Sequence, residues 1–179
     1  MQTRMETAWQ MDDSFARPAH PFGAKRAVAQ WVTLDEHEKI LDLNCTDAAL
    51  LSYFRAKYHV HACGICENPQ KAHHVNEILP EADVLSGRPA DIPWRDNSFD
   101  SVVSALSARG YDDFDSVLAE IKRVLRPGGQ FVLSAPVSMN QNLSPRSVMR
   151  RLQQAGFENV SWRMSGFSGV CIAWKKTDI

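Results

Sequence analysis

The residues best suited to chemistry follow three short apolar segments of the 179-residue chain. Asp42 and Asn44 follow the first segment, Cys66 and Glu67 end the second, and Ser104 ends the third. Carboxylates, amides, thiols and hydroxyls can all hold a ligand through hydrogen bonds. In an open parallel sheet, the carboxyl ends of neighbouring strands form one edge, where ligands bind. We therefore expect these side chains to line one cleft.

The cysteines offer a second kind of chemistry. They are too few and too unevenly spaced for a disulfide scaffold, so thiols are expected. Cys63 and Cys66 have no second pair of the same spacing, and we interpret Cys63 as a buried structural thiol and Cys66 as a pocket-facing one. No metal ligand is assigned. The alternatives are a metal or redox site built from Cys45, Cys63 and Cys66, or a zinc site built from Cys45, Cys66, His73 and His74.

Alternating strands and helices must position these residues. The spacing predicts strands at 39–45, 58–66, 81–85, 98–107, 130–137, 159–164 and 168–175. The first two helices are predicted at 24–32 and from the residue after Asp47 through Phe54. A third begins at Pro69 and is expected to bury Ile78, a fourth has its apolar positions at 117–125 and is stopped by Pro127, and a fifth begins at Pro145. This order predicts a three-layer, doubly wound α/β domain over 23–179, preceded by an irregular arm at 1–22.

One segment carries a family resemblance. Residues 90–134 contain DIPWRDNSFD and, after an apolar segment, RVLRPGG. This pattern resembles the class I S-adenosylmethionine-dependent methyltransferases, a Rossmann-like fold, and the likeness extends over 24–176. The resemblance implies a seven-stranded, mostly parallel sheet whose antiparallel last strand lies between the fifth and sixth strands.

The first loop departs from that family's pattern. Asp42 remains, but the three glycines that follow it are replaced by Asn44, Thr46 and Ala48. Thr46 is the most serious replacement because a β-branched residue is poorly suited to positive φ. We also expect Asp47 to cap the helix that follows.

The resemblance implies a binding site for S-adenosylmethionine. In the family, the residue at Asp42 helps to hold the methionine end of the cofactor, and the position of Cys66 holds an acidic residue that accepts from the ribose. The predicted cofactor contacts are Asp42, Asn44, Cys45, Thr46, Cys66, Glu67, Ala90, Asp91 and Ser104.

The function predicted from this resemblance is methyl transfer from S-adenosylmethionine to an unknown acceptor. No catalytic acid or base is assigned, because in-line transfer from a sulfonium needs mainly positioning and a water-poor site. The alternative is a binding or regulatory protein of the same fold that has lost the cofactor. We expect the cleft to be open, or covered by the N-terminal arm, a protein partner or a second copy of the chain.

Composition narrows the class of protein further. The formal net charge of −1 gives no overall attraction to polyanions, so nucleic-acid binding is not expected. No apolar segment is long enough to cross a bilayer, and the N-terminus lacks a signal-peptide core. The sequence therefore predicts a cytoplasmic protein that does not bind membranes.

Overall fold

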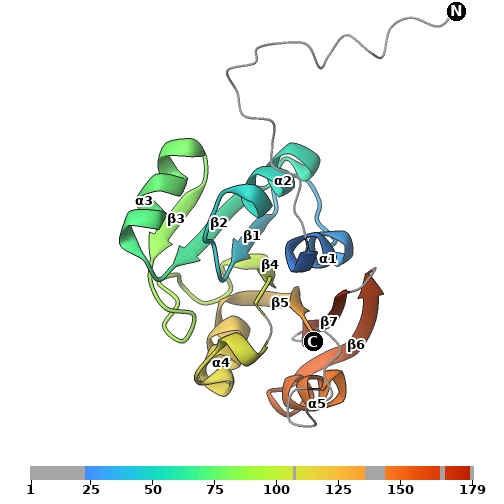
Figure 1. Ribbon diagram of the computed structural model, residues 1–179. Coiled ribbons are helices and arrows are strands. Elements are labelled where there is room, and N and C mark those ends of the chain that lie inside the picture. The colour runs from blue at the N-terminus through green and yellow to red at the C-terminus, as the bar shows by residue number, and fades with distance from the viewer. Residues whose placement is uncertain (1–22, 107, 136–143, 166–167, 178–179) are drawn as a thin grey trace, which may run out of the picture.

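A seven-stranded sheet forms the centre of the molecule (Figure 1). The computed structural model describes residues 23–106, 108–135, 144–165 and 168–177. The strand order is β3-β2-β1-β4-β5-β7-β6, with β1 to β5 parallel and β7 antiparallel to both of its neighbours. The strands are β1 (Lys39–Asp42), β2 (His61–Cys66), β3 (Asp83–Ser86), β4 (Phe99–Ser104), β5 (Leu125–Ser134), β6 (Phe157–Ser165) and β7 (Ser168–Lys175). The predicted fold, including the place of the last strand, is confirmed.

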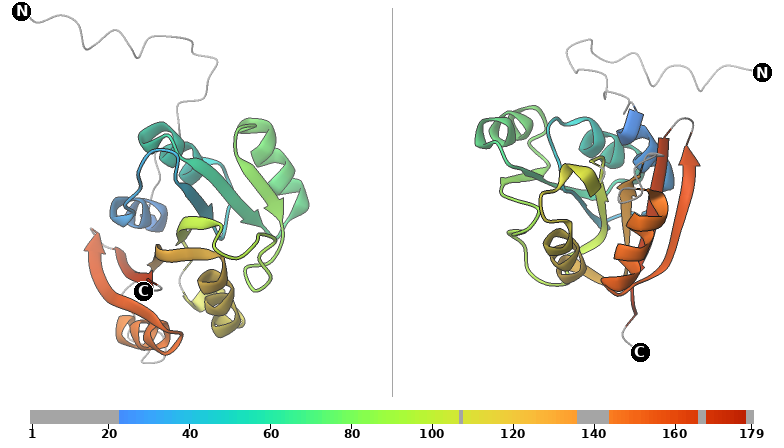
Figure 2. Two further views of the ribbon diagram at one scale, coloured as in Figure 1. Left: turned by 180° about the vertical axis from the view of Figure 1, so that it is seen from behind. Right: turned by 60° about the horizontal axis from the view of Figure 1, so that its bottom comes forward.

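Helices cover both faces of the sheet, giving three layers (Figure 2). They are α1 (Gly23–Trp31), α2 (Ala49–Tyr58), α3 (Pro69–Ile78), α4 (Phe114–Val124) and α5 (Pro145–Gln154), and a single 3-10 turn spans Ala108–Gly110. Buried side chains of α1, α2 and α3 share one apolar cluster, and those of α4 and α5 share the other. The sheet is therefore enclosed on both sides, and ligands can reach it only at an edge.

Helix caps follow the sequence signals. Asn68 and Ser144 accept hydrogen bonds from the amides of Lys71 and Ser147, and each precedes a proline in the first turn. The prediction for Ile78 was wrong, since its side chain is 55% exposed at the end of α3. It lies on the outer side of the last turn of α3, whereas Ala72, Val75 and the next residue, Leu79, pack against the core.

Several predicted boundaries were also wrong. β1 ends at Asp42 and not at residue 45, and β2 begins at His61 and not at residue 58. Helix α4 ends at Val124, and β5 begins at once with Leu125 instead of at residue 130. The RPGG segment is the irregular start of β5, where Gly128 has φ +78° and the register with β4 shifts. β4 ends at Ser104, three residues earlier than predicted. The predicted arm at 1–22 and most of the predicted turn at 165–167 lie outside the described residues.

Among the described residues, no helix is long and apolar enough to cross a membrane.

Candidate functional site

The carboxyl ends of β1, β2 and β4 meet at one edge of the sheet. Asp42, the last residue of β1, is in register with Gly64 on one side and Val103 on the other. Beyond Asp42, the Leu43 amide donates to the Val103 carbonyl at 3.0 Å, and the Cys45 amide donates to the Ile65 carbonyl at 2.9 Å. The first loop is thus held between the ends of β2 and β4.

Asp42 is the most unusual group at this edge. Its side chain is completely buried, and Oδ1 accepts a hydrogen bond from the Asn44 amide at 3.0 Å. Oδ2 is also buried and has no hydrogen-bond partner in the described part of the chain. Burial raises the pKa of this carboxyl from 3.8 to about 6, against the lowering effects of the Asn44 amide and Lys25. An ionised Asp42 is therefore a buried charge short of one partner.

The first loop does not need the glycines it lacks. None of residues 43–48 has a positive φ. The chain instead makes a tight turn in which the Thr46 amide donates to the Asn44 carbonyl at 3.0 Å. Thr46 is exposed at this turn. The predicted strain at Thr46 was wrong, because the loop follows a path that any residue can adopt.

Asp47 stabilises the start of α2. Its Oδ1 accepts from the Ala49 amide at 2.9 Å, and its Oδ2 forms an ion pair with Lys25 at 2.5 Å. Partial burial would raise the pKa of Asp47, but these two donors hold it below its usual value. The predicted cap at Asp47 was wrong by one residue, since the N-cap of α2 is Ala48, which makes no side-chain cap hydrogen bond. Sequence analysis missed Lys25, because its role depends on how α1 packs against a loop 22 residues away.

Cys45 fills space that Gly64 leaves on the neighbouring strand. A Cβ at Gly64 would lie 2.7 Å from the Cys45 Cβ and 2.9 Å from its Sγ. The Cys45 thiol donates to the Asp47 carbonyl at 3.4 Å, and burial raises its pKa well above the usual range. Cys45 is therefore a packing residue that fixes the loop from inside.

The other cysteines are buried as well, so the prediction of a pocket-facing Cys66 was wrong. Cys66 belongs to the same apolar cluster as Cys45, because both side chains point to the α2 side of the sheet. Cys63 lies in the opposite cluster, and burial raises its pKa to about 11. The three thiols therefore do not meet at one site. No group of three or more metal-ligating side chains occurs among the described residues. His73 and His74 are exposed on the surface of α3, beside Glu77.

Ser104 is covered by Tyr111. The two hydroxyl oxygens lie 2.5 Å apart, and Ser104 also donates to the Leu106 carbonyl at 2.9 Å. Burial raises the pKa of the Tyr111 phenol, and the nearby carboxylates Asp42 and Glu67 raise it further. Tyr111 thus stands beside the predicted site, although the predicted cofactor contacts did not include it. The aromatic residue soon after Ser104 was the available signal.

The remaining predicted residues lie at the mouth of this edge. Glu67 is exposed and follows Cys66 in a bend, so the chain has left the strand there. The Gly87 amide donates to the Cys66 carbonyl at 3.2 Å, which brings the segment after β3 to the end of β2. Ala90 is half-buried and Asp91 is exposed on that segment. The structure therefore places the predicted residues along one edge of the sheet, where Asp42, Cys45, Cys66 and Ser104 are buried.

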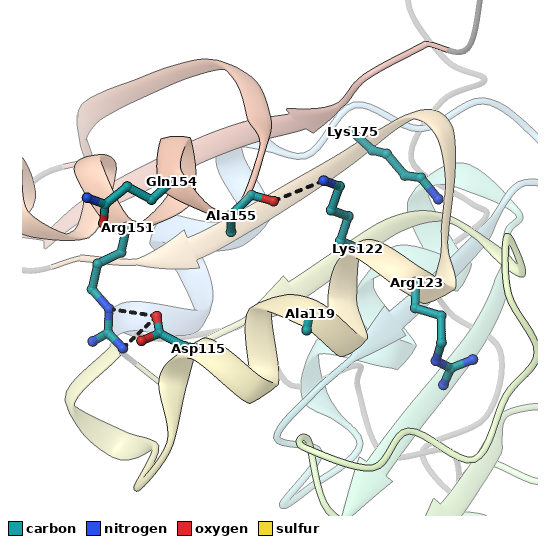
Figure 3. A pocket seen from close by; sticks show the side chains of 8 residues that line it. All are labelled: Asp115, Ala119, Lys122, Arg123, Arg151, Gln154, Ala155 and Lys175. Atoms are coloured by element: carbon teal, nitrogen blue, oxygen red, sulfur yellow. Dashed lines mark hydrogen bonds and ion pairs between the residues drawn. The ribbon is translucent and has the colours of Figure 1, made fainter.

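Two surface grooves lie elsewhere. The larger, of about 660 Å³, runs between α4 and α5 beside the end of β7 (Figure 3). Its polar groups join these elements: Lys122 donates to the Ala155 carbonyl at 3.0 Å, and Arg151 pairs with Asp115 at 2.9 Å. The smaller, of about 270 Å³, lies at the opposite edge of the sheet. None of the predicted site residues lines either groove.

Comparison with known proteins agrees with this architecture. Residues 41–133, just over half of the chain, match the family model described as a methyltransferase domain. A curated relative, the demethylmenaquinone methyltransferase of Streptomyces avermitilis, is 31% identical over 110 residues, which cover 61% of this chain and 47% of that protein. The chain spans less than half of the length of such curated relatives.

Solved structures share the fold at low sequence identity. A methyltransferase in complex with the Trm112 methyltransferase activator of Haloferax volcanii superposes with a TM-score of 0.75 at 16% identity, covering 85% of this chain and 88% of that chain. The [4+2]-cyclase SpnF superposes with a TM-score of 0.72 at 17% identity, covering 86% and 81%. From the family match and this sheet topology, the chain belongs to the methyltransferase domain family, the class I S-adenosylmethionine-dependent methyltransferases.

Proposed function

We propose that the chain binds S-adenosylmethionine along the carboxyl edge of β1, β2 and β4 and transfers its methyl group to an acceptor. The observation that carries this proposal is Asp42, a fully buried carboxylate with one oxygen unpartnered among the described residues. Leaving a buried charge unpaired costs stability, and a cationic ligand group offsets that cost. The ammonium at the methionine end of the cofactor is such a group.

The residues at this edge fit the cofactor unequally. Cys66 does not fit as the acceptor for the ribose hydroxyls, because its side chain packs in the apolar cluster on the α2 side and a thiol is a weak acceptor. Glu67 is one residue later, exposed, and in a bend beyond the strand. A carboxylate can accept from both ribose hydroxyls, and we assign that role to Glu67.

The cofactor supplies an activated methyl group on a sulfonium, so the chain need only bind, orient and exclude water. Asp42 holds the methionine end of the ligand, and Glu67 holds its ribose. The Tyr111 ring stacks on Phe114 with 5.9 Å between ring centroids and covers Ser104, so it closes the floor of the edge to water. No described side chain is needed as an acid or base for this step.

Calorimetry with S-adenosylmethionine and S-adenosylhomocysteine tests this proposal. We expect the full chain to bind both, and Asp42→Asn to weaken binding about 30-fold or more, because a buried charge-assisted contact is lost. The matched control is Asp100→Asn, which changes a carboxylate at the opposite end of β4 and leaves affinity unchanged. The absence of both heat and a thermal shift at millimolar ligand overturns the proposal.

A second candidate is a protein of this fold that does not transfer methyl groups. Two observations favour it: the loop after β1 has no glycine, and the ribose position is the buried Cys66. A neighbour of the same fold is named as a [4+2]-cyclase, so the fold alone does not specify the reaction. A folded chain that binds neither S-adenosylmethionine nor S-adenosylhomocysteine supports this candidate, a protein that has lost the cofactor.

We also propose that a protein partner covers the open carboxyl edge. The Haloferax volcanii neighbour forms a complex with a methyltransferase activator, which supports a partner for this chain as well. Light scattering of the purified chain distinguishes a second copy from a different protein. A dimer supports self-association, and a monomer excludes a second copy as the cover of this edge.

A further inference from the structure

The segment between β3 and β4 forms one wall of the carboxyl edge. Its first residue, Gly87, is tied to the end of β2 through the Cys66 carbonyl. The Asp91 amide donates to the Arg88 carbonyl at 2.9 Å, and the two residues form an isolated bridge, so 88–91 is a closed turn. If the cofactor extends from Asp42 across β2, as proposed above, this turn lies at its nucleoside end.

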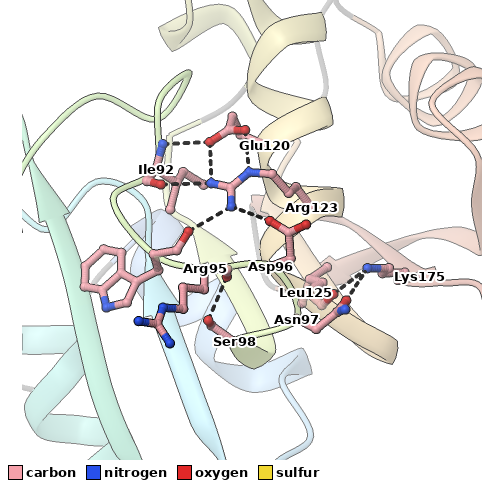
Figure 4. A network of polar contacts seen from close by, with 10 residues as sticks. Ile92, Arg95, Asp96, Asn97, Ser98, Glu120, Arg123, Leu125 and Lys175 are labelled. Carbon is pink, nitrogen blue, oxygen red and sulfur yellow. Dashed lines mark hydrogen bonds and ion pairs between the residues drawn. The ribbon is translucent and has the colours of Figure 1, made fainter.

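The side chain of Arg123, on α4, binds the backbone of this segment (Figure 4). Its Nε and Nη2 donate to the two Glu120 carboxylate oxygens, each at 2.7 Å. Nη2 also donates to the Ile92 carbonyl at 2.9 Å, and Nη1 donates to the Trp94 carbonyl at 2.8 Å and to Asp96 Oδ1 at 2.9 Å. All five guanidinium N–H groups are therefore used.

Glu120 completes the clamp. Its Oε2 accepts from the Ile92 amide at 2.8 Å, so both backbone polar groups of Ile92 are bound by side chains of α4. The Ile92 side chain is buried, and Trp94 packs edge-on against Phe99 with 5.5 Å between ring centroids. Contacts with α4 and β4 therefore fix the backbone conformation directly after Asp91.

The clamp is also electrostatically stable. The hydrogen bonds from Arg123 hold the pKa of Glu120 below its usual value, and those to Glu120 raise the pKa of Arg123. Both groups stay ionised over the physiological range, and charge-assisted forked pairs have the most restricted geometry. Helix α4 is a firm support, because Leu118 and Ile121 are completely buried against the sheet.

We propose that Glu120 and Arg123 are positioning residues, which set affinity for the nucleoside half of the cofactor by fixing the 88–92 turn. This inference rests on the proposed function. Neither residue needs to touch the ligand. Because the turn is already ordered in the free protein, binding does not carry the entropic cost of ordering it, and the affinity is correspondingly higher.

Calorimetry on the full chain tests the clamp with two probes. One is S-adenosylhomocysteine, and the other is 5′-methylthioadenosine, which keeps the nucleoside and lacks the amino-acid end. Arg123→Lys keeps the charge but cannot span the same four partners with one ammonium. We expect Kd for both probes to rise about tenfold and by the same factor. Asp42→Asn, by contrast, weakens S-adenosylhomocysteine and leaves 5′-methylthioadenosine unchanged.

A matched control, Arg126, lies three residues further along the chain than Arg123, in β5. Arg126 makes the same kind of contacts, to Asp100 Oδ1 at 2.6 Å and the Asn97 carbonyl at 3.3 Å, but does not reach the 88–92 turn. We expect Arg126→Lys to leave both Kd values unchanged. Glu120→Gln keeps an oxygen that can accept from Ile92, so its effect falls between those of the wild type and Glu120→Ala, a rescue that a general loss of stability does not give.

Hydrogen exchange at the Ile92 amide reports the clamp without any ligand. Faster exchange in Arg123→Lys and Glu120→Ala with unchanged Kd values overturns the inference alone. If the clamp variants bind S-adenosylhomocysteine more weakly but 5′-methylthioadenosine unchanged, the inference is also overturned, because the clamp then acts on the amino-acid half of the ligand. If the wild type binds neither probe, the proposed function fails and the inference with it. If Arg123→Lys does not fold, Glu120→Gln carries the same test.

Discussion

The loops after β1 and β3 reach the same edge of the sheet but are held in different ways. The loop at 43–48 is held by its own turn, in which amides donate to Asp42 and to the Asn44 carbonyl, and by the neighbouring strand ends, which accept from the Leu43 and Cys45 amides. The segment at 87–97 is stabilised by Arg123 and Glu120, about 30 residues further along the chain. The segment with the family's sequence pattern is thus fixed by side chains of α4, whereas the departing loop is fixed mainly by backbone hydrogen bonds within its own turn and to the neighbouring strand ends.

The electrostatics of the two regions are opposite. Burial raises the pKa of Asp42, whereas hydrogen bonds from Arg123 lower that of Glu120. In the first region the carboxylate has a buried oxygen without a partner among the described residues, and in the second both oxygens are used. The first loop therefore holds a buried acceptor that a ligand can pair with, whereas both carboxylate oxygens in the second region are already bonded within the chain.

The largest expected effect is on the pH dependence of stability at Asp42. Its pKa of about 6 in the folded chain exceeds the unfolded value of 3.8, so folding favours the protonated form. The wild type therefore loses about 3 kcal/mol of stability as pH rises from 3.8 to 6. Asp42→Asn does not lose it. Urea unfolding from pH 4 to 8 measures the difference between the two proteins.

Asp91→Asn is the control for this titration, because Asp91 is exposed at the same edge. Its stability should follow the wild type across the whole range. A constant difference between Asp42→Asn and the wild type from pH 4 to 8 would mean that Asp42 has a partner in solution, and the contrast between the two regions would disappear.

Glu120→Gln should give a smaller effect of opposite sign. The folded pKa of Glu120 is lowered, so its contribution is present at neutral pH and lost as pH falls through the folded value. At pH 7 we expect a loss of about 1 kcal/mol, the difference between charge-assisted and neutral hydrogen bonds. The same urea series checks that this gap closes in acid. A gap that persists there would assign the effect to packing.

The fold could be predicted from the sequence because its signals are local. The caps at Asn68 and Ser144 and the apolar periodicity of α4 each depend on neighbouring residues. The errors arose where tertiary packing decides. β5 starts at Leu125 because Leu125 already pairs with Phe99 of β4 before the irregular segment, and Ile78 is exposed because it lies on the outer side of α3 while Leu79 packs against the core.

The site was predictable only as a location. The edge and Asp42 follow from the order of strands, but which residues face outward depends on packing between strands. Cys66 is buried on the α2 side, and Cys45 is buried in the space beside Gly64. The Arg123 clamp could not be predicted, because it joins a helix to backbone groups 31 residues earlier.

The smallest expected effect concerns the missing glycines. Thr46→Gly with Ala48→Gly should lower stability by about 1 kcal/mol, because none of residues 43–48 has a positive φ and glycine only adds freedom to the unfolded chain. Affinity for S-adenosylhomocysteine should not improve, since Asp42, Cys45 and Asp47 set the path of the loop. Thr46→Ala, which keeps a Cβ, is the control in urea unfolding and calorimetry. Tighter binding by the double variant alone would show that the Cβ atoms, and not the backbone path, separate this loop from the glycine-rich form.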